Sequence, residues 1–158
     1  MEHSTSHKRR RGNSLHEMYR LYLDCFAAMA AYTYRAVMLH PIAESVSALL
    51  GEMAEARMRD FVSLGALLRD RDYSPAINMR LRQMPIALQG KSPAQAAVIT
   101  QQTLLEAISE ERRCAEGYRA VAEHESDKQI CRLLATLCEE AERRAATLSS
   151  LQRRCSGS

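Results

Sequence analysis

A long helical run near the middle of the chain carries charged residues on the face that should be apolar. Residues 49–68 contain no proline and a single β-branched residue, Val62, which favours an α-helix. Steps of three and four residues trace one face of this helix, formed by Val46, Leu49, Met53, Arg57, Asp60, Leu64 and Leu67. Arg57 and Asp60 interrupt an otherwise apolar face. The sequence therefore predicts a polar site in the centre of a helical core.

The composition is that of one α-helical domain. The 158 residues are 46% hydrophobic but include only two phenylalanines, six glycines, four prolines and no tryptophan. Helix-favouring residues therefore dominate, and strand-favouring residues are sparse. A chain of this length is long enough to bury one hydrophobic core. We predict an all-α fold.

Charge and cysteine content bear on the compartment and on partners. The formal net charge is +3, and because much of the excess lies in residues 7–11, we expect the folded part to be close to neutral, whereas a nucleic-acid-binding domain usually has a basic face. Five cysteines without a Cys-x-x-Cys spacing favour a reducing compartment. Neither a signal peptide nor an apolar run of the ~18 to 20 residues that a membrane span needs is visible. We predict a cytoplasmic protein.

Both ends of the chain are polar. Residues 1–13 contain almost nothing apolar, so they cannot offset the entropy lost on ordering, and we predict a disordered basic arm. We predict a second disordered segment at residues 154–158. The basic residues of the arm are Lys8, Arg9, Arg10 and Arg11. Contact with nucleic acid or a membrane through these residues is one interpretation, but a solubilising tail is the commoner role of such segments.

Four helices are predicted between residues 14 and 153. The first ends at His40-Pro41, because helical geometry is disfavoured before proline. The third begins with Ser92 as its cap and Pro93 at its first position, and Ser126 opens the fourth with a capping-box spacing. The predicted spans are residues 14–39, 42–69, 93–124 and 127–153.

The other three helices also carry inward stripes. The first helix has an uncharged stripe: Leu15, Met18, Tyr22, Cys25 or Phe26, Met29, Thr33 and Ala36. The stripe of the third is Ala97, Gln101, Leu104, Ile108, Glu111, Ala115, Tyr118 and Ala122. That of the fourth is Ile130, Leu134, Leu137, Ala141, Arg144, Leu148 and Leu151. The spacing therefore predicts that Glu111 and Arg144 lie inside the core at mid-helix.

A long connector separates the second and third helices. Residues 70–92 are interrupted by Pro75, Pro85 and Gly90. A helix of ~28 residues is ~42 Å long, and about 22 residues of extended chain at ~3.3 Å each can cross that distance. The connector can therefore run the length of the bundle, which permits a crossover connection in place of a simple up-down-up-down order.

These mid-stripe positions resemble those of the ferritin-like superfamily, particularly its small rubrerythrin-like and manganese-catalase-like bacterial members, over residues 15–152. In that family a Glu from each of two helices joins a Glu-x-x-His from each of the other two to bind two metal ions. Residues 57–65 match the family's Glu-x-x-His-x-x-x-Leu-Gly segment, and Glu111 precedes Tyr118 by seven residues, as the family's single Glu precedes a Tyr. The resemblance implies six ligand positions, here occupied by Ala28 or its neighbour, Arg57, Asp60, Glu111, Ala141 and Arg144.

The residues at these six positions are a poor ligand set. Only Glu111 is unchanged and only Asp60 is a carboxylate by substitution, while two arginines would repel a cation. An earlier register on the last helix would use Glu140 and Arg143, but the apolar stripe favours Ala141 and Arg144. The charges of Arg57, Asp60, Glu111 and Arg144 sum to zero, so we predict a buried ion-pair network in the space of the metals. The alternative is that both arginines extend to the rim without partners.

Two functional interpretations follow from the resemblance. The first is a pseudo-ferritin, a structural or interaction protein without enzymatic activity or cofactor. The alternative is a residual metalloprotein of oxidative stress or metal storage, in which Asp60, Glu111 and Glu140 hold iron or manganese. His16, His40 and His124 lie near helix ends without ligand spacing, so we expect them at the surface.

We also expect a homodimer. Ferritin-like bundles commonly pair through the outer faces of their first two helices, and these helices are apolar beyond one stripe. The additional apolar residues are Phe26, Tyr32, Leu50, Met58 and Phe61.

Overall fold

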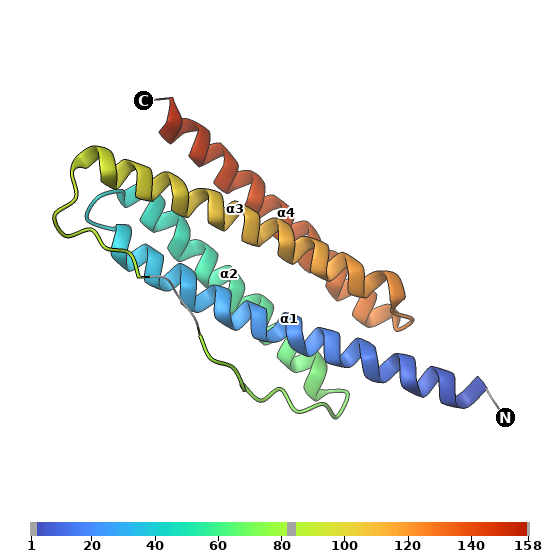
Figure 1. Ribbon diagram of the computed structural model, residues 1–158. Helices are drawn as coiled ribbons and strands as arrows, with labels where there is room; N and C mark the ends of the chain where they lie inside the picture. The colour runs from blue at the N-terminus through green and yellow to red at the C-terminus, as the bar shows by residue number, and fades with distance from the viewer. Residues whose placement is uncertain (1–2, 82–84, 158) are drawn as a thin grey trace.

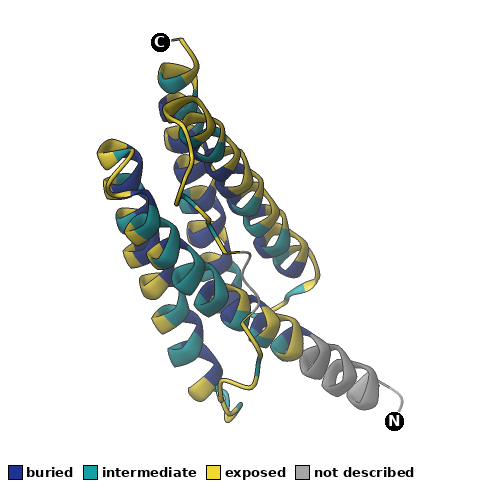
Figure 2. Ribbon diagram, turned by 60° about the vertical axis from the view of Figure 1, so that its left-hand side comes forward, coloured by how far each residue is buried: buried dark blue, intermediate teal, exposed yellow. Residues whose placement is uncertain are grey.

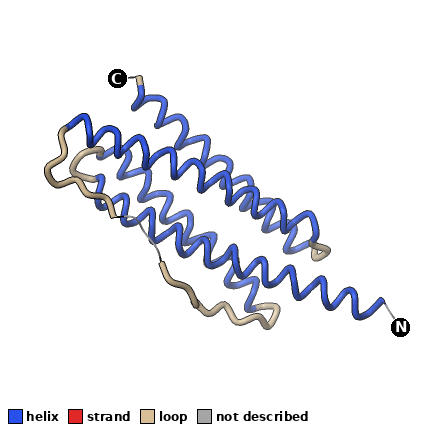
Figure 3. Tube along the Cα trace, viewed as in Figure 1, coloured by secondary structure: helices blue, strands red, loops and turns tan. Residues whose placement is uncertain are grey.

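The computed structural model contains four long helices packed as a bundle (Figures 1 and 3). It describes the backbone of residues 3–81 and 85–157, and side chains from residue 14 onward. The helices are α1 (His3–Leu39), α2 (Glu44–Arg69), α3 (Pro93–His124) and α4 (Lys128–Ser156). The described backbone contains no strand. The prediction of an all-α four-helix bundle is confirmed. The helix α1 begins at His3 and not at residue 14, so the segment predicted to be a disordered basic arm, residues 1–13, has helical backbone from His3 onward. The side chains of this segment lie outside those that the structure describes.

The segment between α2 and α3 is tied to α1 by tyrosine hydroxyls. The hydroxyls of Tyr19 and Tyr22 donate to the carbonyl oxygens of Ala76 and Pro75, at 2.6 Å and 2.7 Å. Further along α1, the hydroxyl of Tyr34 accepts from the backbone N–H of Ile86 at 2.9 Å. The segment therefore follows α1 in the direction of α1 itself (Figure 1). As a result α3 starts at the same end of the bundle as α2, and the two run in the same direction.

Side-chain caps define the starts of α3 and α4. Ser92 caps α3 as predicted and forms a capping box with Gln95, because the Gln95 N–H donates to Ser92 Oγ at 3.2 Å and the Ser92 N–H donates to Gln95 Oε1 at 2.9 Å. The cap of α4 is Asp127 and not Ser126, since the Asp127 carboxylate accepts from two backbone N–H groups, at 2.9 Å and 3.3 Å. That carboxylate also bonds Arg71 Nη2 at 2.7 Å. The aspartate therefore joins the α3–α4 turn to the end of α2.

The end of α4 differs from its predicted end. The helix continues to Ser156 rather than ending at residue 153. The Ser156 hydroxyl donates to the Gln152 carbonyl oxygen at 2.9 Å and contacts Gln101 Oε1 on α3 at 3.3 Å. These contacts hold the last turn against α3, so the segment predicted to be disordered from residue 154 begins with helix.

The core consists of two apolar clusters, one toward each end of the bundle. One cluster contains Met18, Leu64, Tyr118 and Leu134. The other contains Tyr32, Leu50, Leu104 and Leu148. Along α2, α3 and α4 the residues between the clusters are the charged ones of the predicted stripes. From residue 14 onward, the buried faces of the helices point toward the interior of the bundle (Figure 2), so the charged residues form a layer between two apolar regions.

The inward face of α1 differs from its predicted stripe. Thr33 is exposed, whereas Tyr32 and Leu39 are fully buried at 0% exposure. The predicted stripe takes two successive steps of four residues, from Cys25 to Thr33. Two helical turns need fewer than eight residues, so these steps rotate the predicted face away from the core. A step of seven from Cys25 reaches Tyr32 and stays on the inward face.

The surface predicted for dimer formation also changes. Tyr32 and Leu50 are core residues, and Phe26 and Phe61 are half-buried, whereas Met58 is exposed at 45%. The homodimer stays a prediction, now resting on fewer apolar residues. Within the described residues, none of the helices combines the length and the apolar character that a membrane crossing requires.

The cap of α4 can be tested by paired substitutions. We expect Asp127→Ala to lower the free energy of unfolding by about 1 kcal/mol, because the N-terminal N–H groups lose their acceptor. Asp127→Asn keeps an acceptor oxygen and loses only the charge that pairs with Arg71, so it should cost less. Urea denaturation of both variants measures the difference. Equal losses would contradict a capping role.

Candidate functional site

The charged layer brings together the four residues predicted to meet in the core. Arg57 and Asp60 come from α2, Glu111 from α3 and Arg144 from α4. Their exposed fractions are 1%, 1%, 0% and 8% respectively. Neither arginine extends to the rim unpaired, because both make ion pairs with the two carboxylates.

Glu111 is the centre of this ion-pair network, which we define as Arg57, Asp60, Glu111 and Arg144. Arg57 donates from Nε to Glu111 Oε1 at 3.1 Å, and its Nη2 lies 3.0 Å from Oε2. Arg144 Nε donates to Oε2 at 2.8 Å. Two guanidinium groups therefore neutralise one carboxylate that water does not reach, and the planar fork of Arg57 matches its geometry.

Asp60 closes the network from the side of α2. Its Oδ2 accepts from Arg144 Nη2 at 2.8 Å and from Arg57 Nη1 at 3.5 Å. Each arginine thus contacts both carboxylates. The network has two positive and two negative charges, and its internal neutrality offsets the large cost of removing each ion from water.

Two further residues extend the network. The Tyr32 hydroxyl of α1 donates to Glu111 Oε1 at 2.8 Å, so all four helices contribute a polar group. Cys114, one turn after Glu111, lies with its Sγ 2.7 Å from Arg57 Nη1. The sequence reasoning missed both residues as parts of the site. A step of seven residues on α1 could have placed Tyr32 at this depth, whereas a thiol has no sequence signal of its own.

All polar groups of the layer have partners. Within the described residues, every buried side-chain nitrogen or oxygen atom has a hydrogen-bond partner. Complete pairing of this kind is what allows a polar network to lie in a core, since a single unpaired charge would be strongly destabilising.

Burial sets the direction of several pKa shifts. It raises the pKa of Asp60, although Arg144 and Arg57 oppose the effect. It also raises the pKa of Tyr32 well above its ordinary value, helped by the negative charge of Glu111. Burial disfavours the charged form of Arg144, but Glu111 and Asp60 outweigh it and raise the pKa of that guanidinium. Both arginines therefore stay charged, and Tyr32 stays a hydrogen-bond donor.

The residues of the layer do not fit a dinuclear metal centre. Ala28 and Ala141 offer no donor atom, and Ala141 belongs to an apolar cluster. Arg57 and Arg144 put cations where ligands would be needed, and each oxygen of Glu111 already has two partners. Nowhere in the described part of the chain do three or more His, Cys, Asp or Glu side chains gather closely enough to hold a metal ion. Asp60, Glu111 and Glu140, the ligands of the alternative interpretation, therefore do not form such a group.

The three histidines predicted to lie at the surface are apart from the layer. His16, His40 and His124 are exposed, as predicted.

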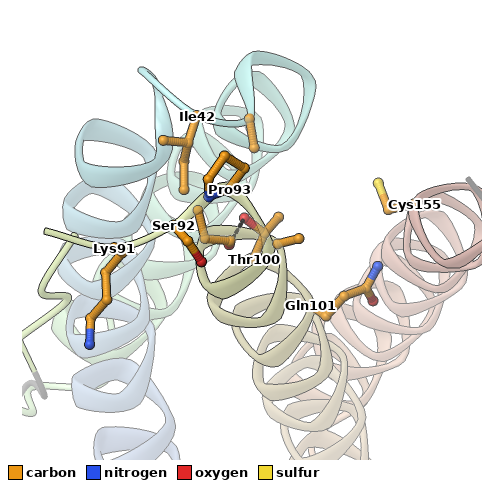
Figure 4. A pocket seen from close by; sticks show the side chains of 10 residues that line it. Ile42, Lys91, Ser92, Pro93, Thr100, Gln101 and Cys155 are labelled. Carbon is orange, nitrogen blue, oxygen red and sulfur yellow. Dashed lines mark hydrogen bonds between the residues drawn. The ribbon is translucent and has the colours of Figure 1, made fainter. Parts of the chain in front are cut away.

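A hollow of about 440 Å³ lies where the starts of α2 and α3 meet the end of α4 (Figure 4). Its lining is mainly apolar or neutral, and its ionisable members are Lys91 and Cys155. The Lys91 side chain extends away from the other labelled residues (Figure 4), so this hollow offers no set of catalytic or ligating groups.

Comparison with known proteins supports the four-helix fold. No protein-family profile matches the chain, and no curated protein sequence matches it. A crystal structure of a conserved hypothetical protein, rv2844, from Mycobacterium tuberculosis is similar to the chain with a TM-score of 0.60. The two share 18% sequence identity over 88% of this chain and 92% of that chain. At this identity the similarity establishes a shared four-helix fold alone.

Removal of either arginine tests the network energetically. We expect Arg57→Ala and Arg144→Ala each to lower the free energy of unfolding by about 3 kcal/mol, because a buried carboxylate loses its counter-ion. Arg69→Ala is the matched control, since Arg69 pairs with Asp70 at the surface with 71% of its side chain exposed, and it should cost under about 1 kcal/mol. Chemical denaturation measures all three. Network variants as stable as the control would show that the buried pairs contribute little.

Loss of one hydroxyl tests the contribution of α1. Tyr32→Phe keeps the ring and removes the donor to Glu111, so we expect a loss of about 1.5 kcal/mol. Tyr19→Phe removes an exposed hydroxyl that donates to a carbonyl oxygen and should cost less. A Tyr32→Phe variant with the midpoint and slope of the wild type in urea would argue against a role for this hydroxyl.

The pKa values of two aspartates should be shifted in opposite directions. Burial raises the pKa of Asp60 above its ordinary 3.8, whereas the hydrogen bond from Arg71 lowers that of Asp127 below 3.8. The stability contribution of Asp60 is therefore present at low pH and lost as pH rises through its folded pKa, and that of Asp127 is lost as pH falls through its folded pKa. Side-chain carboxyl NMR measures both midpoints. A midpoint of Asp60 below that of Asp127 would contradict this assignment.

Proposed function

We propose that this protein is a pseudo-ferritin, a ferritin-like bundle that acts as a non-enzymatic structural or interaction protein. The observation that carries the proposal is the ion-pair network itself. Positions that resemble the ligand positions of the ferritin-like superfamily are filled by two cations, two carboxylates and two alanines. Their charges are balanced within the layer, so no metal ion is needed to neutralise the carboxylates.

The course of the chain supports the same proposal. The connector follows α1 along the bundle, so that α2 and α3 run in the same direction. A crossover of this kind between the second and third helices is characteristic of ferritin-like topology. We further propose that the protein works in the cytoplasm as a homodimer, with its partner surface on the outer faces of α1 and α2.

The residual metalloprotein is less well supported. Iron or manganese would need Asp60 and Glu111 as ligands, but these carboxylates accept hydrogen bonds from Arg57 and Arg144 at 2.8 to 3.5 Å. Metal entry would have to displace both guanidinium groups from a buried layer, and their charges would repel the incoming ion.

Thermal melting with and without manganese or iron tests the proposal. We expect the wild-type melting temperature to be indifferent to either metal, because no ligand set is available. A variant with Arg57→Glu, Asp60→His, Ala141→Glu and Arg144→His should gain stability by mass action when metal is added. It is made with Glu either at position 28 or at position 32, since Tyr32 is the α1 residue that reaches Glu111.

Each outcome of this experiment has a defined meaning. Elemental analysis that finds about one transition metal per wild-type chain would overturn the proposal in favour of a metalloprotein. A folded restored variant that ignores metal would contradict the ferritin-like register of the six positions. Recovered binding should weaken at acid pH, because the new ligands must be deprotonated.

A further inference from the structure

A groove between α1 and α3 reaches the ion-pair network from the surface. The two helices meet at its ends, where Ser14 hydrogen-bonds Glu125 and Arg35 contacts Glu110 at 3.0 Å. Between these contacts a hollow of about 720 Å³ is lined by small and charged residues of both helices, with Arg57 and Cys114 also in its lining. The charged residues of α1 and α3 are Glu17, Arg20, Asp24, Glu110 and Arg113. The small residues are Ala27, Ala28, Ala31, Gly117 and Ala120. The groove thus gives small molecules a route to the edge of the layer formed by Arg57 and Cys114.

Cys114 is the nucleophilic group at this edge. Its residue is half-buried, in contrast to Cys25 and Cys138, which are buried at 0% and 9% exposure. The guanidinium of Arg57 lies 2.7 Å from its sulfur. Because Arg57 is also held by Glu111 and is itself 1% exposed, this cation cannot turn away into solvent. A fixed cation beside a sulfur favours its anionic forms and its anionic oxidation products.

A second thiol lies close to the first. Cys25 Sγ is 3.1 Å from the Tyr118 hydroxyl, and Tyr118 follows Cys114 by one turn of α3. The half-buried Cys114, which Arg57 contacts, therefore lies one helical turn from a hydroxyl that contacts the buried Cys25. Thiols that respond to oxidants commonly have a low pKa, are accessible and lie next to a second thiol. Cys114 shares the last two properties, whereas burial raises its pKa.

We propose that Cys114 is an oxidation site for hydrogen peroxide and small organic hydroperoxides, which reach it through the groove. The sulfur attacks one peroxide oxygen, so that an S–O bond forms and the O–O bond breaks. The released hydroxide or alkoxide takes the thiol proton and leaves as water or alcohol. Sulfur loses two electrons, the peroxide gains them, and Cys114 becomes a sulfenic acid. This site goes beyond the proposed function and rests only on the contacts described.

Oxidation at Cys114 acts directly on the network. Arg57 Nη1 donates both to Cys114 Sγ at 2.7 Å and to Asp60 Oδ2 at 3.5 Å. An oxygen on the sulfur is a stronger acceptor than the sulfur itself, so it draws the Nη1 amino group of Arg57, whose two N–H bonds serve Cys114 and Asp60, away from Asp60. The hydrogen bonding of the layer therefore depends on the oxidation state of one half-buried thiol.

The reaction should accelerate as pH rises. Burial raises the pKa of Cys114, and Arg57 opposes this rise, so the thiol form prevails at neutral pH and the reactive thiolate increases above it. The charged and titratable groups around Cys114 include Cys25 of α1, Arg57 of α2, Glu111 and Tyr118 of α3, and Cys138 of α4. Glu17, Arg20 and Asp24 of α1 and Glu110 and Arg113 of α3 line the same groove. Burial raises the pKa of Cys25 further, to about 12, so Cys25 should respond last.

Sulfenic-acid trapping in the full chain tests the proposal. The reduced protein is treated with hydrogen peroxide in the presence of dimedone at several pH values, and peptide mass spectrometry quantifies the adduct on all five cysteines. We expect about fivefold more adduct on Cys114 than on Cys25 or Cys138, with a yield that rises with pH. In concentrated urea the difference should disappear, because it depends on the fold. Native labelling of Cys114 no greater than that of Cys25, or labelling confined to Cys131 and Cys155, would overturn the proposal.

Cysteine variants test whether the oxidation product forms at Cys114. Without dimedone, condensation of the Cys114 sulfenic acid with the Cys25 thiol releases water and leaves a disulfide. A peptide pair that joins these two cysteines therefore supports the proposal, since it requires the same sulfenic acid. Cys114→Ser should abolish this pair and the main dimedone adduct, and Cys155→Ser should leave both unchanged. Retention of the adduct signal in Cys114→Ser would place the oxidation at another residue and overturn the assignment.

Discussion

The neutralisation of Glu111 is the constraint on which the rest of the core depends. A carboxylate at 0% exposure in the middle of a bundle is tolerated only with counter-charges and donors at its oxygens. The chain supplies one donor from each of the other three helices, Tyr32, Arg57 and Arg144. Because Glu111 balances the charge of only one of the two arginines, the network also needs Asp60, whose negative charge makes the sum of the four charges zero. The buried charge of Glu111 therefore constrains how all four helices pack at the middle of the bundle.

The fold was largely predictable because its signals are local. Ser92 with Pro93, and His40 before Pro41, mark helix boundaries through backbone chemistry that needs no tertiary context. The charged residues Arg57, Glu111 and Arg144 could be placed at one depth because each interrupts a long apolar stripe. Asp127 displaced Ser126 as the cap of α4 because Arg71, distant in sequence, binds its carboxylate, and such a partner is invisible in a local pattern.

The missed parts of the site have a different cause. Tyr32 was assigned to the outer face because helical stepping by four accumulates an angular error, and two equally apolar faces of α1 left the error undetected. Cys114 was missed because a thiol in a helix usually reads as a small apolar residue. Its contact with Arg57 depends on the distance between α2 and α3, which no single-helix pattern contains.

The network also bears on the order in which the chain folds. Its links join residues far apart in sequence, with separations of 54, 79 and 84 residues for Arg57–Glu111, Tyr32–Glu111 and Asp60–Arg144. The α1–α2 and α3–α4 hairpins instead form through nearby segments, which close faster than distant ones. Each hairpin can therefore assemble before its charges are paired. The ion pairs form when the hairpins dock, and since a displacement by one helical turn would leave a buried charge alone, they restrict docking to a single register.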